Sequence, residues 1–319
     1  MISIGKATSA EYYTSGVEGA AGAESYYLDA VTGGEPAGLW SGAGAEALGL
    51  TGEVDDADME TVYGEFVNPR TSATIGRRPD RPHAVQDRLA EALAAEPDAL
   101  PERVEEIRRQ VERKERTAVI GWDATFSVAK SVTVAHTAMH RAELAARRAG
   151  DDVKAEEYAA TRLAIEDAMR VGNSAMLDYA ARLTTSRTGG GSGTPVKWIA
   201  APGLVTATFF QHTNRNIDPQ LHWHNVLLNR ARCTDGAWRA LDGQDLLAQQ
   251  HALGAIADRV MEEQLTALGF EFELRPDGIA RELTVIDPAI ADLFSSRSRQ
   301  VTARVAQVLP EAEERLGRE

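Results

Sequence analysis

The chain has 319 residues, 43% of them hydrophobic, which is enough to fill one large or two ordinary globular cores. No run of about 18 uncharged apolar residues is present and no basic, apolar signal opens the chain, which excludes a membrane-inserted protein and predicts a cytoplasmic one. The single cysteine, Cys233, excludes a disulfide framework and a cysteine-rich zinc site.

The net charge of −14 argues against nucleic-acid binding, because Lys and Arg contacts to phosphate supply most of the non-specific affinity. The acidity is unevenly distributed. Residues 1–70 carry 12 acidic and 2 basic side chains, whereas the remaining 249 residues carry 36 acidic and 32 basic ones. DNA binding is therefore compatible with most of the chain, and only the acidic N-terminal part counts against it.

The first 60 residues are rich in Gly and Ala and contain two tyrosine pairs, Tyr12-Tyr13 and Tyr26-Tyr27, in helix-compatible stretches. This composition predicts an adaptable flap. A polar, proline-broken loop at 77–82 follows. Residues 101–116 alternate Glu and Arg at helical spacing, which is typical of a solvated helix with i,i+4 ion pairs.

Apolar periodicity predicts the elements of the rest of the chain. The expected strands are 121–127 and 204–213, and the expected helices are 129–148, 155–183 and 244–268. A hairpin of 270–274 with 279–286 should turn at Pro276-Asp277-Gly278. Strands and helices mix without a regular βαβ repeat, which favours an α+β sandwich with a largely antiparallel sheet.

Three histidines gather near residue 217. His222 and His224 alternate along an apolar stretch, so a strand would direct both side chains to one face and Trp223 into the core. A hairpin centred near Ile217 would set His212 opposite His222, with Cβ atoms about 4.5–5.5 Å apart, close enough for three imidazoles to share a cation. The alternative is a set of half-buried structural histidines. His136 and His140 also have ligand-like spacing, but their motif contains no carboxylate and we interpret them as structural.

Three neutral imidazoles would leave a divalent ion strongly Lewis-acidic. Imidazole favours Zn²⁺, Ni²⁺ or Cu²⁺, whereas Mg²⁺ and Mn²⁺ prefer oxygen, so the metal stays open. A tyrosine hydroxyl with a pKa of about 10 is only about 0.1% ionised at pH 7 and needs a nearby cation to act as a nucleophile. Asp123 could accept its proton or fix the tautomer of a metal-binding imidazole. Alternatively, the tyrosine pairs pack at a core edge and Asp123 ends a strand.

Several segments in this order carry a resemblance to a known family. They are the tyrosine pairs, residues 40–54 (WSGAGAEALGLTGEV), 123–132 (DATFSVAKSV), the histidine segment and 294–299 (FSSRSR). The chain resembles the MobF-type conjugative relaxases, whose N-terminal HUH endonuclease domains nick plasmid DNA at the transfer origin. The resemblance covers nearly the whole chain. One departure is that the interval from His212 to His222 is one residue shorter than usual in the family.

The resemblance implies a palm-like sandwich in which a central antiparallel sheet carries the histidines, helices pack on it and an N-terminal flap covers a DNA cleft. It implies that Tyr12 and Tyr26 attack DNA to give a 5′-phosphotyrosyl adduct, while the division of labour with Tyr13 and Tyr27 stays open. His212, His222 and His224 would hold a divalent ion, with Mg²⁺ or Mn²⁺ in use and Zn²⁺, Ni²⁺ or Cu²⁺ as alternatives. Asp123 would support the site.

The expected partners are single-stranded and hairpin DNA of the transfer origin, relaxosome proteins and the coupling protein of a type IV secretion system, bound by a monomer. Residues 1–300 would form the relaxase domain, and 301–319 a helical tail that leads toward a helicase region. We expect phosphate contacts from Arg77, Arg78, Lys130 and Arg215.

Three other functions remain open. A metal-dependent hydrolase would activate water at the same histidines, and the tyrosine pairs would then be incidental. An HUH replication initiator or transposase would use the same chemistry, although tyrosines that precede the histidines favour the relaxase order. A non-catalytic module that recognises a DNA hairpin would use the histidines only structurally.

Overall fold

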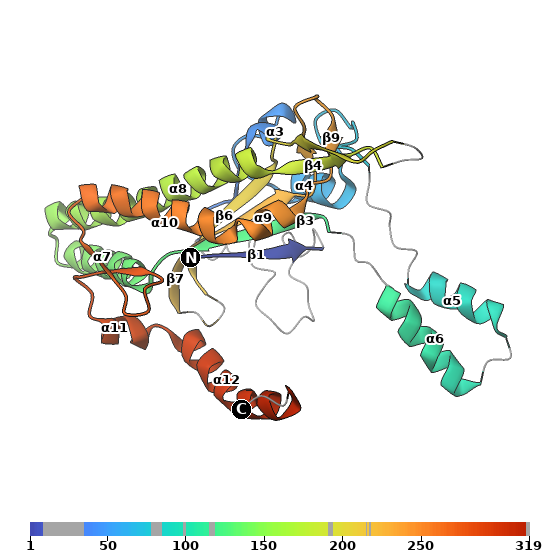
Figure 1. Cartoon of the computed structure of the whole chain (residues 1–319). Coiled ribbons are helices and arrows are strands. Elements are labelled where there is room, and N and C mark those ends of the chain that lie inside the picture. The colour runs from blue at the N-terminus through green and yellow to red at the C-terminus, as the bar shows by residue number, and fades with distance from the viewer. Residues whose placement is uncertain are drawn as a thin grey trace.

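The computed structural model describes residues 1–8, 35–77, 85–97, 100–114, 119–190, 194–214, 216 and 218–316. Its centre is a five-stranded antiparallel sheet with the strand order β1-β3-β7-β6-β2 (Figure 1). The strands are β1 (Ile2–Ala7), β2 (Leu39–Ser41), β3 (Gly121–Ser127), β6 (Thr206–Thr213) and β7 (Pro219–Leu228). The α+β architecture that the sequence predicts is thus confirmed.

The other described elements surround this sheet. Three two-stranded ribbons pair β4 (Thr185–Thr188) with β5 (Lys197–Ala200), β8 (Ala231–Arg232) with β9 (Trp238–Arg239), and β10 (Phe272–Leu274) with β11 (Arg281–Leu283). The helices are α3 (Ala43–Ala47), α4 (Asp56–Met59), the π-helix η1 (Glu60–Gly64), α5 (Val85–Ala95), α6 (Pro101–Lys114), α7 (Lys130–Arg148), α8 (Asp152–Leu183), α9 (Gly243–Ala248), α10 (Gln250–Ala267), α11 (Pro288–Leu293) and α12 (Ser296–Leu316). Among the described residues, none of these helices is long and apolar enough to cross a membrane.

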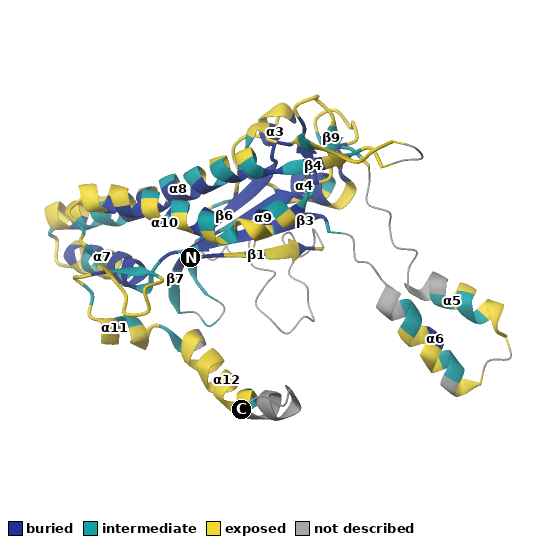
Figure 2. Ribbon diagram, viewed as in Figure 1, coloured by how far each residue is buried: buried dark blue, intermediate teal, exposed yellow. Residues whose placement is uncertain are grey.

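Two hydrophobic cores lie on opposite faces of the sheet, because successive side chains of a strand alternate between its faces. On one face, Phe210 and Trp223 pack in the core that α7, α8 and α10 cover (Figures 1 and 2). On the other face, Phe209 and Val226 pack with the segment that contains α3, α4 and η1. Each side chain of β6 and β7 can therefore be assigned to the helical face or to the opposite face.

Buried polar groups fix how β7 sits against both layers. Asn225 of β7 and Asn173 of α8 exchange two hydrogen bonds of 2.8 Å across the helical face. On the other face, the buried Tyr63 hydroxyl donates to the Val226 carbonyl and accepts from the Ala207 N–H at 3.2 Å. Because buried polar groups are costly when unpaired, these contacts specify one register for the central strands.

The predicted elements agree closely with the described ones, with two corrections. The helix expected over 244–268 is divided into α9 and α10 at Gln249, which belongs to neither helix. The expectation of a flap over residues 1–60 is wrong for parts of that range, because Ile2–Ala7 and Leu39–Ser41 form the two edge strands of the sheet. The predicted domain boundary at residue 300 falls within α12 and stays a prediction.

Candidate active site

Two histidines share the face of the sheet that is opposite α8. His224 of β7 lies between Thr125 of β3 and Phe209 of β6, and His222 lies between Ser127 and Gln211. The two imidazole rings are 4.9 Å apart between centroids and nearly perpendicular, at 72°. The prediction that alternate positions of one strand direct both histidines to one face, with the buried Trp223 on the other, is confirmed.

Hydrogen bonds on Nδ1 orient both imidazoles. His224 Nδ1 lies 2.8 Å from Asp123 Oδ2 and 3.1 Å from the Thr125 hydroxyl. His222 Nδ1 lies 2.8 Å from the Gln220 carbonyl oxygen. A proton on Nδ1 satisfies each of these acceptors and leaves the lone pair on Nε2, which is the arrangement of metal-binding histidines. Asp123 therefore contacts His224, and its supporting role stays a prediction.

The electrostatics of His222 also suit a ligand. Burial, with a smaller contribution from His224, lowers the pKa of His222 to about 4. Its imidazole is therefore neutral at pH 7, and a neutral imidazole is the form that binds a metal ion.

His212 is not where the sequence predicts it. The register places Gln211 opposite His222 and Thr213 opposite Pro219, so a bulge sets one residue of β6 against two of β7. The expectation that His212 lies opposite His222 is therefore wrong. The His212 ring makes an edge contact with Phe210, at 4.8 Å between centroids, and lies 5.5 Å from the ring of His136 of α7. Both neighbours belong to the helical side of the sheet.

A second cluster forms around His212 on that side. His212 hydrogen-bonds Glu35 through Nδ1, and its Nε2 lies 3.8 Å from Glu166 of α8. Glu166 also accepts from His136 Nε2 at 2.7 Å and from Arg162 at 2.9 Å. One ligand atom each of His136, Glu166 and His212 lies within 4.8 Å of the others, a group that could hold a metal ion.

The charges in this cluster stabilise one another. Desolvation opposes protonation of His212, but the nearby carboxylates of Glu166 and Glu35 raise its pKa to about 9. Desolvation likewise opposes ionisation of Glu166, but the hydrogen bond from His136 and the nearby His212 lower its pKa well below the ordinary value. Without a metal, His212 is therefore an imidazolium at neutral pH, and the cluster is a network of ion pairs.

Sequence reasoning missed His136, Glu166 and Glu35 as partners of His212. Glu35 and Glu166 come from distant parts of the chain, and no local motif connects them to a histidine. The available signal was the position of His136 one turn beyond the buried Val132, on the core-facing side of α7. That spacing predicts a buried side chain but does not identify its partner.

The connection between β6 and β7 is held by polar contacts. Asn214 Oδ1 accepts from the backbone N–H groups of Asn216 and Asp218, at 2.8 and 3.2 Å. Asp218 accepts from the backbone and hydroxyl of Ser296, at 2.9 and 2.6 Å, and thereby ties the start of α12 to this loop. Lys130, whose phosphate contact stays a prediction, donates to the Pro219 carbonyl at 2.7 Å. Burial lowers the Lys130 pKa.

Several predicted site residues lie outside the described part of the chain. These are the four tyrosines, Tyr12, Tyr13, Tyr26 and Tyr27, and the arginines Arg78 and Arg215. Arg77 is described and exposed, and its carbonyl oxygen accepts from the Arg230 guanidinium. The structure thus brings together Asp123, His222 and His224.

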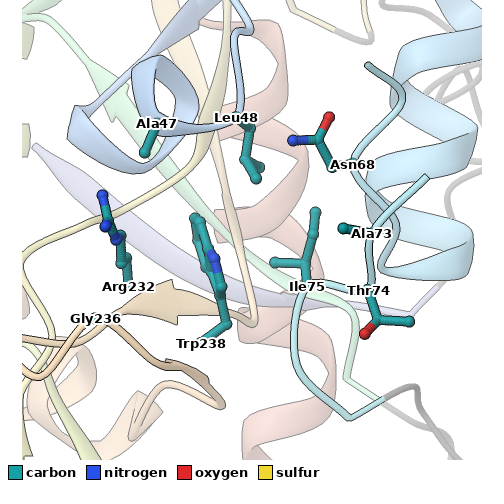
Figure 3. Close-up of a pocket in the computed structure, with 9 residues that line it drawn as sticks. All are labelled: Ala47, Leu48, Asn68, Ala73, Thr74, Ile75, Arg232, Gly236 and Trp238. Carbon is teal, nitrogen blue, oxygen red and sulfur yellow. The ribbon is translucent and has the colours of Figure 1, made fainter. Parts of the chain in front are cut away.

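A pocket of about 230 Å³ lies apart from this constellation. Figure 3 shows the residues that line it, which include Asn68, Ile75, Arg232 and Trp238. None of the nine lining residues is a predicted catalytic or metal-binding residue. The chemistry that the sequence predicts is therefore at the sheet histidines and not in this pocket.

Comparisons with known proteins identify the family of the chain. A family model described as TrwC relaxase matches residues 6–319. Two relatives, both the multifunctional conjugation protein TraI, one from Escherichia coli and one from its strain K12, are 27% and 26% identical over 277 residues. Each match covers 84% of this chain and 12% of the relative, so the chain spans about an eighth of their length.

Solved structures of the conjugative relaxase TrwC in complex with oriT DNA have a similar fold. The metal-free complex aligns with a TM-score of 0.62 at 25% identity, and the metal-bound complex with a TM-score of 0.61 at 27% identity. Both alignments cover 96% of this chain and 83% of the solved chain.

Proposed function

Because the chain belongs to the TrwC relaxase family, we propose that it is a metal-dependent DNA relaxase of conjugation. It nicks single-stranded DNA at a transfer origin, at one site and in one strand, and forms a 5′-phosphotyrosyl adduct that it later transfers. The proposal extends to this chain what the names of its relatives describe, a conjugation protein and relaxases in complex with oriT DNA.

The observation that carries the proposal is the pair His222 and His224, whose Nδ1 atoms are hydrogen-bonded on a face shared with Asp123. A cluster of imidazoles with fixed tautomers has the donor chemistry of a divalent metal site. A divalent ion held there would polarise a scissile phosphate and stabilise the charge of the attacking phenolate. We propose Mg²⁺ or Mn²⁺ as the ion in use, with Zn²⁺, Ni²⁺ or Cu²⁺ able to occupy the site.

The reaction needs a phenol near this face, and we assign that role to Tyr12 and Tyr26, with Tyr13 and Tyr27 as the neighbours that could share it. The phenol oxygen forms a bond to phosphorus, the bond from phosphorus to the 3′-oxygen breaks, and the phenol proton goes to a base while the 3′-oxygen gains one. Attack by a 3′-hydroxyl reverses these steps and rejoins the strand without ATP, since the phosphodiester energy is conserved.

An exposed ribbon supports contact with DNA. In β4–β5, Arg187 pairs in register with Trp198, and the next pair includes Lys197. The Trp198 side chain is 57% exposed, which is unusual for an aromatic residue of this size. Exposed aromatic and basic side chains on a two-stranded ribbon suit a nucleic-acid surface, where rings stack on bases and cations contact phosphates. We assign hairpin DNA of the origin to this ribbon.

The remaining parts of the proposal follow from the family. Residues 1–300 form the nicking and strand-transfer domain and 301–319 a helical tail. The chain acts in the cytoplasm as a monomer, with relaxosome proteins and a secretion-system coupling protein as partners. Arg77, Arg78, Lys130 and Arg215 remain proposed phosphate contacts.

The proposal is tested with a labelled single-stranded oligonucleotide from the transfer origin of the element that encodes the chain, incubated with Mg²⁺ or Mn²⁺. We expect a covalent adduct that resists denaturation and disappears in the Tyr12→Phe variant alone or combined with Tyr26→Phe. Tyr158→Phe, on the partly buried surface of α8, is the matched control and should retain the adduct.

Each rival function predicts a different result. A hydrolase that activates water would cleave the oligonucleotide without an adduct, and a variant with all four early tyrosines replaced would remain active. A non-catalytic module would bind hairpin DNA tightly without cleavage, and a chelator would not affect the binding. An adduct that persists in the four-fold Tyr→Phe variant would show that the nucleophile is assigned wrongly.

A further inference from the structure

Gln211 occupies the strand position that faces His222. The β6–β7 register pairs their Cα atoms directly, and the next pair on the same face is Phe209 with His224. Directly opposed residues of an antiparallel pair have Cβ atoms about 4.5–5.5 Å apart. Phe209 and Gln211 are thus the β6 residues that oppose the two histidines on their own face, and Gln211 is the polar one.

The Gln211 side chain is enclosed but has no partner for its amide nitrogen among the described residues. The residue is only 4% exposed, and the nitrogen is buried. A buried amide group without a partner is destabilising, because no new hydrogen bond offsets its loss of contact with water. Rotation about the last side-chain bond exchanges the amide oxygen and nitrogen, so the enclosed position can present a carbonyl oxygen. A buried polar group without a protein partner is a position where an ion or a water molecule can supply the missing partner, and here it lies opposite His222.

His212, the alternative third donor, is held on the other side of the sheet. Its backbone N–H donates to Glu35 at 2.9 Å, and its ring also hydrogen-bonds that carboxylate. Its Nε2 faces Glu166 at 3.8 Å, and its ring lies against Phe210 of the helical core. To join His222 and His224, His212 would have to leave these partners, and β6 would have to shift by one residue against β7.

We propose that the amide oxygen of Gln211, and not an imidazole of His212, is the third protein donor of the metal site of His222 and His224. The inference rests on the proposed function, because it concerns the same ion. It has a chemical consequence. Two imidazoles with an amide oxygen form a harder donor set than three imidazoles, which favours Mn²⁺ and Mg²⁺ relative to Ni²⁺, Cu²⁺ and Zn²⁺.

The test is a titration of the 319-residue chain with Mn²⁺, in which the electron paramagnetic resonance signal of free Mn²⁺ gives the Kd. We expect one tight site per chain, at His222 and His224, because His136, Glu166 and His212 are engaged in ion pairs. Gln211→Leu, which keeps the approximate size and removes the oxygen, should weaken binding by about 10–100-fold. Gln211→Glu, which retains an oxygen donor, should bind at least as tightly as the wild type. His212→Gln is the matched control and should stay within about twofold, since its side chain contributes nothing to the ion.

His222→Ala separates failure of this inference from failure of the proposed function. If His222→Ala leaves the Kd unchanged, the proposed metal site is itself wrong. If His222→Ala abolishes binding but Gln211→Leu does not change it, only the role of Gln211 is overturned. Circular dichroism and the Tm of each variant show whether it is folded.

A second measurement does not depend on a loss of binding. With Cu²⁺ bound to the wild type, the nitrogen hyperfine pattern should report two coordinating imidazoles, and Gln211→His should increase the number to three. Three imidazoles in the wild type, reduced to two by His212→Gln, would overturn the inference.

Discussion

Replacement of Asp123 by asparagine isolates the contribution of a charged acceptor behind a proposed metal ligand. Asp123 Oδ2 lies 2.8 Å from His224 Nδ1, and both side chains are mostly buried, with 16% and 15% exposure. A hydrogen bond to a charged group contributes about 1.5–3 kcal/mol, whereas a neutral one contributes about 0.5–1.5 kcal/mol. The asparagine amide keeps an acceptor but loses the charge, so the difference is about 1–2 kcal/mol.

That difference corresponds to a loss of about 5–30-fold in Mn²⁺ affinity. Isothermal titration of both proteins measures it directly, and single-turnover cleavage of an origin oligonucleotide at limiting metal should fall by a similar factor. Saturating Mn²⁺ should restore most of the rate. Asp178→Asn, at an exposed position of α8, is the control for removal of one negative charge.

Two results would refute this reasoning. An unchanged Kd with a lower rate at saturating metal would mean that Asp123 acts on the reacting groups and not through His224. An unchanged Kd and an unchanged rate would mean that the contact has no functional consequence. Thr125→Val, which removes the neutral contact to His224 at 3.1 Å, should have a smaller effect than the loss of the carboxylate charge.

Three further predictions concern stability. Because the folded pKa of His212 is raised to about 9, its ion pairs should stabilise the wild type relative to His212→Gln below pH 6.5, and this advantage should vanish as the pH rises through 9. Urea unfolding at pH 6 should show that the wild type is about 1–2 kcal/mol more stable than His212→Gln, allowing for a side chain that is 31% exposed. A stability difference that does not change with pH would contradict the ion pairs. Asn225→Ala should cost about 2–3 kcal/mol, since it leaves the buried Asn173 amide without its partner, and a loss below about 0.5 kcal/mol in thermal unfolding would exclude that contact. Gly172→Ala should cost about 1–3 kcal/mol, because the new Cβ would lie 2.5 Å from the Ala257 carbonyl oxygen of α10, and an unchanged Tm would show that the two helices can separate.

The periodic helices and strands could be predicted from the sequence, because burial of one side of an element imposes a regular spacing of apolar residues. The strand at 121–127 is found at those residues, and Ile165, Met169 and Met176 of α8 are buried as their spacing predicts. The break between α9 and α10 could not be predicted in this way, since the residues around Gln249 include neither Gly nor Pro to mark the end of a helix.

The paired histidines could be predicted for the same reason, and the third could not. His222 and His224 belong to one strand, so the period of two residues fixes their common face without knowledge of any neighbour. Whether His212 shares their face depends on how two strands are aligned, and the register that pairs Gln211 with His222 puts the adjacent His212 on the opposite face. Register arises from the geometry of the pair and is not encoded in the apolar pattern of either strand.

The register of the two strands also decides which chemistry each face receives. Because adjacent residues of β6 lie on opposite faces, the face opposite the helices receives a neutral amide, Gln211, and the helical face receives a basic imidazole, His212, which pairs with Glu166 and Glu35. The bulge lies on the loop side of the pair Gln211 and His222, so neither the bulge nor the length of the connection at 214–218 changes these faces. Reversal would require an insertion or deletion within β6 itself. A one-residue deletion at Thr208 should therefore move His212 to the face of His222, at the cost of exchanging Phe209 and Phe210 between the two cores, and this cost is the physical reason why the observed register is fixed.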